Sequence, residues 1–412
     1  MSEKVRKGRY LIFLKDVFIL ALSAFGGPQA HIAMLFERMV EKRAYLTEDE
    51  LLELNALCNI LPGPTSTQII TALGYKYGGP NLAYLTLLVW ILPAGSIMIV
   101  LGVFVSTLHK YGMSLDFARY IQPMAVGFIF YASYKIGSKV LNTKTGITLG
   151  LFSAVIAFFV SSNYGGMKIA SLAYPILLIA GGLLSALKYK RLPRQRKKEK
   201  LDIQWGNFIL FIVVFVAAVV MTYASTNRLF NIFEIFYRDG SLIFGGGQVL
   251  IPLLKAEFVD LYQWLDVDEF LSGFGFVQAI PGPVFSFSGY IGAVSMSEYG
   301  VTASIWGGLV ALAGVFLPGT FLIFFVIRFW GELKQYRGVR ASIEGVSAVG
   351  VGLVTAAAFL LSKPMNTKLT EGIGLTNIAI ILVTIALLHS KKVPAPIIVV
   401  IGVVTGIIST YL

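Results

Sequence analysis

The triplet Pro-Gly-Pro occurs twice in the chain, at residues 62–64 and 281–283, each time inside an apolar stretch. Proline lacks an amide donor and clashes with the preceding helical turn, and glycine adopts backbone angles that other residues avoid, so each triplet should divide a helix into two halves. The first amide groups of the second half-helix have no intrahelical partner, and the helix dipole adds partial positive charge there. Such an N-terminus is suited to binding an anion.

Glycine-rich breaks of a second kind occur in "FGGPQAHI", residues 25–32, and in "FGGGQVLI", residues 244–251. Four half-helix N-termini that meet near a pseudo-two-fold axis would suit a tetrahedral oxyanion, which offers acceptors in four directions. The alternative is that these breaks are plain kinks, since proline and glycine are common in membrane helices. The candidate anion-binding residues are Gly26, Gly27, Gln29, His31, Pro62, Gly63, Pro64, Thr65, Ser66, Thr67, Gly245, Gly246, Gly247, Gln248, Pro281, Gly282, Pro283, Ser286 and Ser288.

The composition of the chain is that of an integral membrane protein. Of its 412 residues, 56% are hydrophobic and only 14% are charged, and the mean hydropathy is +0.75. Uncharged runs such as 83–107 and 205–225 reach the roughly 20 residues that cross a hydrocarbon core of about 30 Å. Such runs recur along the chain, which predicts an all-α polytopic membrane protein. The single cysteine, Cys58, allows no internal disulfide.

The chain also repeats itself. A shift of 219 positions aligns the two Pro-Gly-Pro triplets, and the same shift aligns Gln29 with Gln248 and Glu50 with Glu269. These matches indicate an internal duplication. We therefore predict a first transporter repeat at 1–188, a basic cytoplasmic linker at 189–203, a connecting transmembrane helix at 204–228 and a second, inverted transporter repeat at 229–412. The last three spans are expected at 117–138, 146–162 and 168–187 in the first repeat, and at 341–362, 373–389 and 394–410 in the second.

Lysine and arginine mark opposite sides of the membrane in the two repeats. The loop with Arg38, Lys42 and Arg43 is basic, whereas its counterpart at 255–270 has one lysine among five acidic residues. Because cytoplasmic loops are rich in lysine and arginine, the repeats should have inverted topology, with the N-terminus in the cytoplasm. The segments near Lys42 and Asp260 should then face opposite sides. Inverted repeats are typical of secondary transporters.

The broken segments are too short to cross the membrane. Half-helices at 11–25 and 28–41, and at 50–61 and 65–78, are predicted to form re-entrant hairpins, with equivalents in the second repeat. Irregular backbone at membrane depth occurs only where protein covers it or where it lines a wet cavity. The breaks should therefore lie inside the molecule.

The segments "FGGPQAHIAMLFERMVEKRAYLTEDELLELNALCNILPGPTSTQIITALGY" and "DGSLIFGGGQVLIPLLKAEFVDLYQWLDVDEFLSGFGFVQAIPGPVFSFSGYIGA" resemble the paired signatures of the chromate ion transporter family, in its long, two-domain form. The resemblance implies a secondary transporter of a bacterial or archaeal inner membrane that expels chromate, a structural mimic of sulfate, and so confers chromate resistance. It also implies coupling to the proton-motive force or to sulfate exchange, as in an antiporter. Uptake of sulfate or another oxyanion, or an anion channel, stays open.

Other chemistry finds little support in the sequence. No G-x-x-x-x-G-K-[ST] loop for ATP and no H-E-x-x-H motif for a metal occurs, so we expect no enzyme activity, cofactor or metal. The basic run at 188–200 comes without an aromatic-basic module, so the expected partners are an inorganic oxyanion and membrane lipid, and not nucleic acid. A homodimer is a further way to shield the hairpins. His31 can be a structural histidine or a proton acceptor, and Arg238 is expected to pair with Glu234 at i, i+4 spacing.

Overall fold

The computed structural model describes residues 3–25, 27–59, 61–112, 118–164, 168–187, 204–243, 247–327, 337–366 and 373–411. These residues form helices and connecting turns, without a strand among them. Five helices are long and apolar enough to cross a membrane, namely α4, α6, α8, α13 and α15. The prediction of an all-α polytopic membrane protein is confirmed.

The first repeat and the helix that follows it consist of α1 (Glu3–Ser23), α2 (Gly27–Leu35), the π-helix η1 (Phe36–Lys42), α3 (Glu48–Cys58), α4 (Thr65–Lys110), α5 (Ile121–Val140), α6 (Lys144–Tyr164), α7 (Lys168–Ala186) and α8 (Gly206–Ala224). The remaining elements are α9 (Arg228–Leu242), η4 (Gly247–Val249), α10 (Leu250–Leu254), the π-helix η5 (Lys255–Leu261), α11 (Val267–Ala279), η6 (Val284–Ser286), α12 (Phe287–Ser295), η7 (Ser297–Tyr299), α13 (Val301–Val326), α15 (Arg337–Asn366), α16 (Ile373–Ser390) and α17 (Ala395–Tyr411).

Helix α4 is broken near its first third. Its 46 residues would extend about 69 Å at 1.5 Å per residue, more than twice the thickness of a hydrocarbon core. Gly78 and Gly79 leave the helical region, with φ of −152° and +78°, and Pro80 follows them. The helix therefore consists of a short arm from Thr65 and a long arm after Pro80, and the short arm coincides with the half-helix predicted at 65–78.

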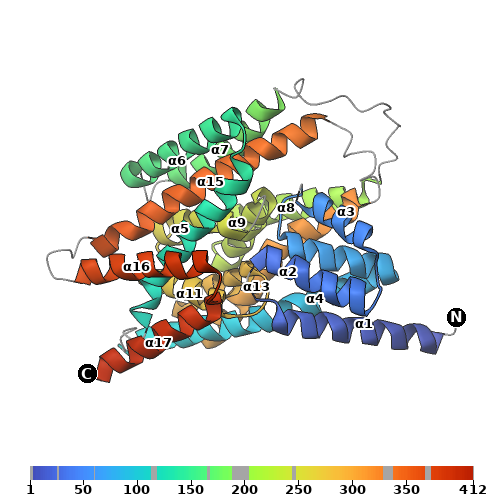
Figure 1. Cartoon of the computed structure of the whole chain (residues 1–412), viewed down its shortest axis with the longest axis horizontal. Coiled ribbons are helices and arrows are strands. Elements are labelled where there is room, and N and C mark those ends of the chain that lie inside the picture. Colours follow the sequence, from blue (N-terminus) through green and yellow to red (C-terminus); the bar gives the residue numbers. More distant parts are fainter. Residues whose placement is uncertain are drawn as a thin grey trace.

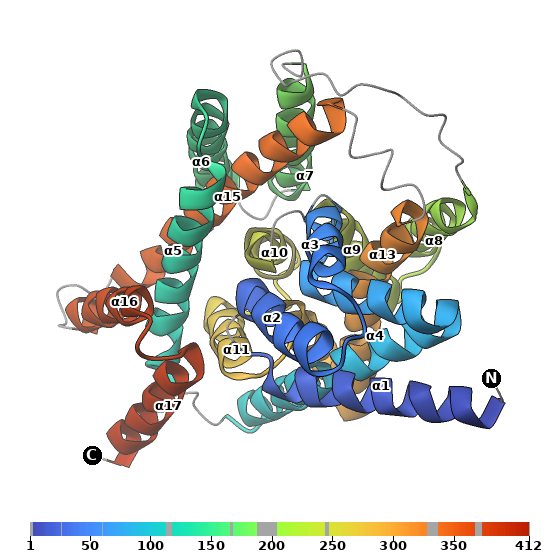
Figure 2. The same ribbon diagram turned by 45° about the vertical axis from the view of Figure 1, so that its right-hand side comes forward.

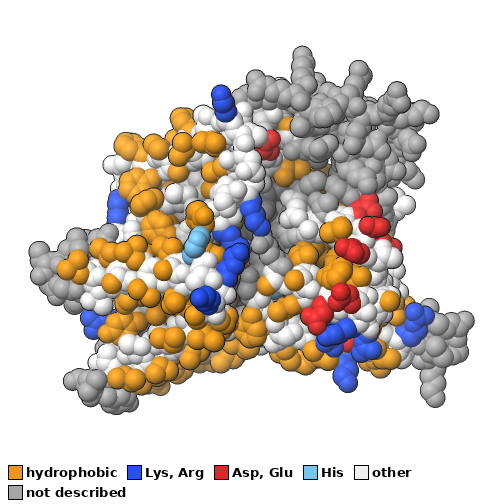
Figure 3. Space-filling model, viewed as in Figure 1, with side chains coloured by type: hydrophobic (Ala, Val, Ile, Leu, Met, Phe, Trp, Pro, Cys, Tyr) orange, Lys and Arg blue, Asp and Glu red, His pale blue; other side chains and the backbone are white. Residues whose placement is uncertain are grey.

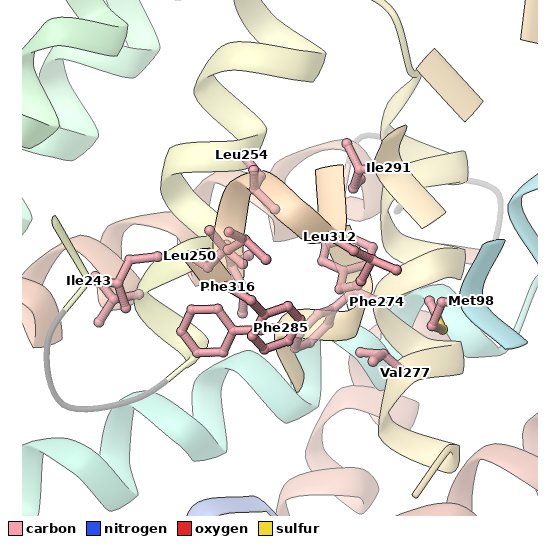
Figure 4. Packing of buried hydrophobic residues seen from close by; sticks show 14 of the residues in the cluster. Met98, Ile243, Leu250, Leu254, Phe274, Val277, Phe285, Ile291, Leu312 and Phe316 are labelled. Atoms are coloured by element: carbon pink, nitrogen blue, oxygen red, sulfur yellow. The ribbon is translucent and has the colours of Figure 1, made fainter. Parts of the chain in front are cut away.

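The helices gather into two groups (Figures 1 and 2). One group contains α5, α6 and α7 from the first half together with α15, α16 and α17 from the second. The other contains α1 to α4 and α8 to α13, and its core is aromatic and aliphatic, with Phe274, Phe285, Phe316 and Leu312 packed together (Figure 4). Helix α11 contacts α5 and α17 and so links the two groups.

The two halves interlock. Helix α15 packs on α6 and α7 of the first half, and α5 packs on α16 of the second. Within the central pair, Ser133 of α5 contacts Thr355 of α15, and Phe130 contacts Phe359, so residue numbers fall in one helix as they rise in the other. The equivalent helices α5 and α15 therefore run antiparallel.

Local structure recurs at the spacing of 219 residues. The π-helices Phe36–Lys42 and Lys255–Leu261 are separated by this interval, and so are two capping boxes, in which Thr47 pairs with Glu50 and Asp266 with Glu269. In each box the N-cap side chain accepts from the N3 amide while the N3 carboxylate accepts from the N-cap amide, which fixes the start of the helix. Hydrogen bonds from Lys76 and from the Thr47 amide lower the pKa of the Glu50 carboxyl.

Apolar side chains cover much of the outer surface, as the face over α16, α17 and α1 shows (Figure 3). Helix α8 is the extreme case, since only 6% of its most apolar 18-residue stretch is buried inside the protein. Exposed Ile209, Val213, Val216 and Val220 follow one another along it. A surface of this kind suits contact with lipid and not with water.

Candidate functional site

The two Pro-Gly-Pro breaks are built alike and each is bound by the other half of the chain. Gly63 and Gly282 have φ of +117° and +123°, which side-chain-bearing residues rarely adopt. The Gly63 amide donates to the Ile243 carbonyl at 2.7 Å, and the Gly282 amide donates to the Ala24 carbonyl at 2.8 Å. Both acceptors directly follow a helix, α9 or α1, and precede a glycine-rich break. Each triplet is thereby held beside the glycine-rich break of the opposite repeat.

Glycine is also needed because the backbones approach closely. A Cβ atom at Gly63 would lie 3.1 Å from the Gly319 Cα, and one at Gly282 would lie 2.7 Å from the Ala94 Cβ. Gly319 and Ala94 directly follow the prolines within α13 and α4, Pro318 and Pro93. Each triplet therefore packs against the proline kink of the other repeat.

Residues of both repeats line one small cavity beside these breaks. The lining consists of His31, Pro64, Thr65, Ser66, Gly247, Pro283, Val284 and Phe285. These residues come from α2, from the start of α4, from η4 and from the segment that enters η6, so all four predicted breaks contribute. The cavity volume is about 10 Å³, which is room for about one water molecule. An oxyanion with four oxygens requires the cavity to widen.

His31 connects three of the segments around the cavity. Its side chain is buried, its Nε2 lies 2.9 Å from the Ala24 carbonyl, and its Nδ1 lies 3.0 Å from the Ser66 hydroxyl. Because a carbonyl can only accept, Nε2 carries the proton and Nδ1 accepts from Ser66. The Ala24 carbonyl thus accepts both from His31 and from the Gly282 amide. Both ring nitrogens of His31 are therefore hydrogen-bonded within the protein.

The other candidates fall into four sets. Thr67 accepts a hydrogen bond from the Trp90 indole at 3.1 Å, and Ser288 donates to the Phe285 carbonyl at 2.8 Å, so both hydroxyls have a partner within the protein. The Ser286 hydroxyl is buried without a partner among the described residues. Gly26, Gly245 and Gly246 lie outside the described residues, as do the side chains of Gln29 and Gln248. Gly27 begins α2, and Pro62 and Pro281 belong to the two breaks.

Gln68 is a site residue that the sequence analysis missed. Its amide nitrogen donates to the Pro62 carbonyl at 2.8 Å and to the Gly319 carbonyl at 3.2 Å, and so ties the first triplet to α13. Its side-chain oxygen is buried and has no partner among the described residues. The available signal was its position four residues after Pro64, where a side chain on the first helical turn can fold back toward the break.

Ion pairs join the two arms of each glycine-rich hairpin. In the first repeat, Asp16 of α1 accepts from Arg38 of η1 at 2.8 Å. In the second, Arg238 of α9 donates to Glu257 of η5 at 2.8 Å. Positions 38 and 257 are equivalent under the 219-residue shift and carry opposite charges, whereas their partners Asp16 and Arg238 are not equivalent under it. The predicted pair of Arg238 with Glu234 is present at 3.8 Å, and the contact of Arg238 with Glu257 is shorter.

One further polar cluster lies at the start of α11. His109 Nδ1 is 3.2 Å from Glu269, and with Asp266 these side chains place ligand-type atoms within 4.8 Å of one another. Both carboxylates already accept from backbone amides in the capping box. The cluster therefore anchors the end of α4 to a helix start.

Comparison with protein families identifies the chain. The model of the family described as chromate transporter matches residues 11–187 and matches again at residues 230–407. The chain belongs to the chromate transporter family. The two matches begin 219 residues apart, the same interval that separates the Pro-Gly-Pro triplets.

Two proteins named as chromate transport proteins can be aligned with nearly the whole chain. A probable chromate transport protein of Synechococcus elongatus is 26% identical over 400 residues, covering 95% of this chain and 94% of its own length. The chromate transport protein of Cupriavidus metallidurans is 24% identical, covering 95% and 90%. A shorter relative, the uncharacterized transporter YwrA of Bacillus subtilis, is 28% identical over 121 residues, which are 29% of this chain and 68% of that protein. No solved structure matches the chain.

Proposed function

We propose that the protein is a secondary active transporter of a tetrahedral oxyanion that exports chromate across the cytoplasmic membrane, driven by the proton-motive force or by exchange for another anion. The observation that carries the proposal is the small cavity to which both repeats contribute residues at their helix breaks. The N-terminus and the basic linker at 189–203 would lie in the cytoplasm.

Anion binding follows from the groups that face the cavity. Thr65 and Ser66 stand at the first turn of α4, where amide groups have no helical acceptor. Among the described residues, no acidic side chain and no lysine or arginine lines the cavity. Backbone amides and hydroxyls would therefore replace the hydration of the ion, with the helix dipole adding partial positive charge.

A carrier explains this geometry better than an open pore. The cavity is too small for the ion, so binding requires the surrounding breaks to separate. The antiparallel course of α5 and α15 supports two repeats of opposite orientation, in which one repeat can open while the other closes. Lys135 and Lys139 at the end of α5 lie near Lys391 at the end of α16, so a cytoplasmic basic surface would form where inverted repeats require it.

Transport into everted vesicles tests the proposal. Radiolabelled chromate and sulfate should be taken up by saturable kinetics, with a faster rate under an imposed proton gradient or a counter-anion gradient, and labelled anion should show counterflow. Chromate should be preferred over sulfate. Uptake that is linear in concentration and lacks counterflow would indicate a channel, and a preference for sulfate would indicate an uptake permease for that ion.

A further inference from the structure

An apolar groove lies where α5 of the first repeat meets α16 and α17 of the second. Its volume is about 230 Å³, compared with about 10 Å³ for the cavity at the helix breaks. Met124 of α5 lines the groove, together with one face of α16 from Thr376 to Leu387 and with Ile398 and Ile401 of α17. Apart from two threonines, the lining is apolar. The groove therefore suits a hydrocarbon chain.

The groove opens toward the apolar outer surface. Val383 and Ile401 line it and are 56% and 50% exposed, and their neighbours Leu382 and Val400 are exposed as well. In a membrane such a surface contacts acyl chains and not water. The lining face of α16, residues 376–387, extends about 16 Å at 1.5 Å per residue, close to half of a hydrocarbon core of about 30 Å. An acyl chain of one leaflet therefore matches the groove in length.

Four lysines stand at one end of the groove. Helices α5 and α16 run in the same direction here, since Thr384 lies beside Gly127 and His389 lies beside Tyr134. Their ends therefore lie together, and basic side chains gather at this end of α16 (Figure 3). The lysines are Lys135 and Lys139 on α5 and Lys391 and Lys392 directly after α16.

These lysines form no ion pair with another described residue. Lys139 and Lys391 repel the ammonium group of Lys135, which stands 5.9 Å from the centre of the Tyr131 ring. Helices α5, α16 and α17 contain no acidic residue. Glu344 of α15 reaches the segment that follows α5, but there it accepts from the Thr143 hydroxyl. Positive charges that lie together without a counter-charge attract an anion.

We propose that the groove and the four lysines together bind one phospholipid with an anionic headgroup, such as phosphatidylglycerol. An acyl chain lies in the groove, and the phosphate lies among the ammonium groups at its end. Basic pockets between membrane helices bind anionic headgroups in this way. A zwitterionic lipid also fits the groove, but it brings a positive charge to the lysines, so the headgroup charge sets the selectivity. The inference does not rest on the transport function.

The bound lipid would contact both halves of the chain. The groove is lined by α5 from the first half and by α16 and α17 from the second. Helix α11 packs on α5 and α17 and leads into the second Pro-Gly-Pro triplet. A lipid in the groove therefore adds contacts at a junction of the two halves, and phosphatidylglycerol should raise the unfolding midpoint of the delipidated protein.

Native mass spectrometry of the delipidated full chain tests the headgroup site. With phosphatidylglycerol and phosphatidylcholine of identical acyl chains, wild type should bind phosphatidylglycerol at least fivefold more tightly. Lys135→Gln and Lys391→Gln should each lower this preference about fivefold. Lys363→Gln is the control, because Lys363 lies at the other end of the antiparallel α15 and donates to Ser162 at 2.9 Å. Equal binding of both lipids to wild type, or a preference unchanged in both lysine variants, would overturn the proposal.

Two neighbouring residues of α16 test the groove. Val383→Trp fills it and should abolish retention of phosphatidylglycerol, whereas Leu382→Trp, at an equally exposed position outside the lining, should leave retention unchanged. Both changes point away from the core, and a monodisperse peak verifies folding. Glycerol phosphate in excess should not displace the lipid. Displacement by glycerol phosphate would indicate a site for free phosphate, and a dimer lost only in Val383→Trp would indicate a second copy of the chain. Either result, or equal lipid retention in both variants, contradicts the inference.

Discussion

His31 and Ser66 show how single side chains connect the two repeats around the cavity. The histidine accepts from Ser66 on one side and donates to Ala24 on the other, and Ala24 also receives the Gly282 amide. Hydrogen bonds thus connect His31 to Ser66, close to the first Pro-Gly-Pro triplet, and through the Ala24 carbonyl to the second triplet. Ser286, a candidate serine of the second repeat, has no hydrogen-bond partner among the described residues.

Replacement of the two serines should therefore have unequal effects. Ser66→Ala removes the donor to His31 Nδ1 and should lower the free energy of unfolding by about 1 kcal/mol, because a buried acceptor is left unpaired. It should also raise the apparent transport constant for the anion, since Ser66 lines the cavity. Ser286→Ala removes an unpartnered hydroxyl and should leave the unfolding midpoint nearly unchanged. Concentration series of chromate uptake and thermal unfolding in detergent measure both, and equal effects would refute the assignment.

Gly282 is constrained both by its backbone angle and by its neighbour. Gly282→Ala combines a positive φ with a Cβ contact of 2.7 Å to Ala94, and should cost about 1–3 kcal/mol of unfolding free energy and most of the transport activity. Gly300→Ala is the matched control, because Gly300 has φ of +94° and open space around its Cβ position. It should show the backbone cost without the loss of transport.

A second-site change separates the two causes further. Ala94→Gly in the Gly282→Ala background removes the Cβ that the new side chain meets and should restore part of the activity per folded molecule. The readout is transport normalised to the monodisperse peak in size-exclusion chromatography. Without any recovery, close approach to the α4 kink would not be the reason for glycine at this position.

Among the elements, the glycine-rich hairpins depend on their ion pairs. Asp16→Asn leaves Arg38 and Arg43 facing a neutral amide, and since hydrogen bonds to charged groups contribute more than neutral ones, we expect a loss of about 2–3 kcal/mol in unfolding free energy. Glu37→Gln is the control, because Glu37 and Lys42 form an exposed pair, with side chains 58% and 62% exposed, and such pairs contribute little. Thermal unfolding of both variants in the same detergent measures the difference, and an equal shift would mean that the buried pair does not hold the hairpin.

The elements themselves were largely predictable, while their partners were not. Proline, glycine and capping residues act on the chain next to them, so the break at 62–64 and the start of α4 at Thr65 follow from local rules. The span predicted at 146–162 corresponds to α6, Lys144–Tyr164, for the same reason. By contrast, Gln68 binds Gly319 across 251 residues, and Arg238 prefers Glu257 to the local Glu234. No periodicity in one segment encodes such contacts, because they form only when the two halves pack.

At the scale of the whole molecule, the two halves contact each other both at the helix breaks and along their long helices. The triplet of each half binds the other half, α5 packs on α16, and α15 packs on α6. Equivalent helices run antiparallel in the long arms as well, since Gly95 of α4 faces Leu312 of α13 and Ile99 faces Gly308. One repeat could not complete the cavity alone, because its lining comes from both.

This arrangement predicts that equivalent positions lie on opposite sides of the membrane. Asp49 and Asp268 are identical residues 219 positions apart, and both are exposed in the first turn of their helices, α3 and α11. In a Cys58→Ser background, Asp49→Cys should react with an impermeant thiol reagent from the cytoplasmic side and Asp268→Cys from the other side. Cys58 itself is buried, so its replacement should disturb only packing, and the background must first be shown to transport.

The basis for this expectation is physical, because arginine and lysine near spans stay in the cytoplasm. Arg38 and Arg43 flank α3 in the first repeat, whereas Glu257 and Asp260 occupy the matching stretch before α11. The stretches before α3 and α11 keep the same local fold, including the two π-helices, but differ in charge. A duplicated unit needs this difference in order to insert into the membrane in both orientations. Labelling of both cysteines from one side of the membrane would leave the antiparallel helices α5 and α15 without a role in alternating access, and the carrier would have to work by a motion within a single repeat.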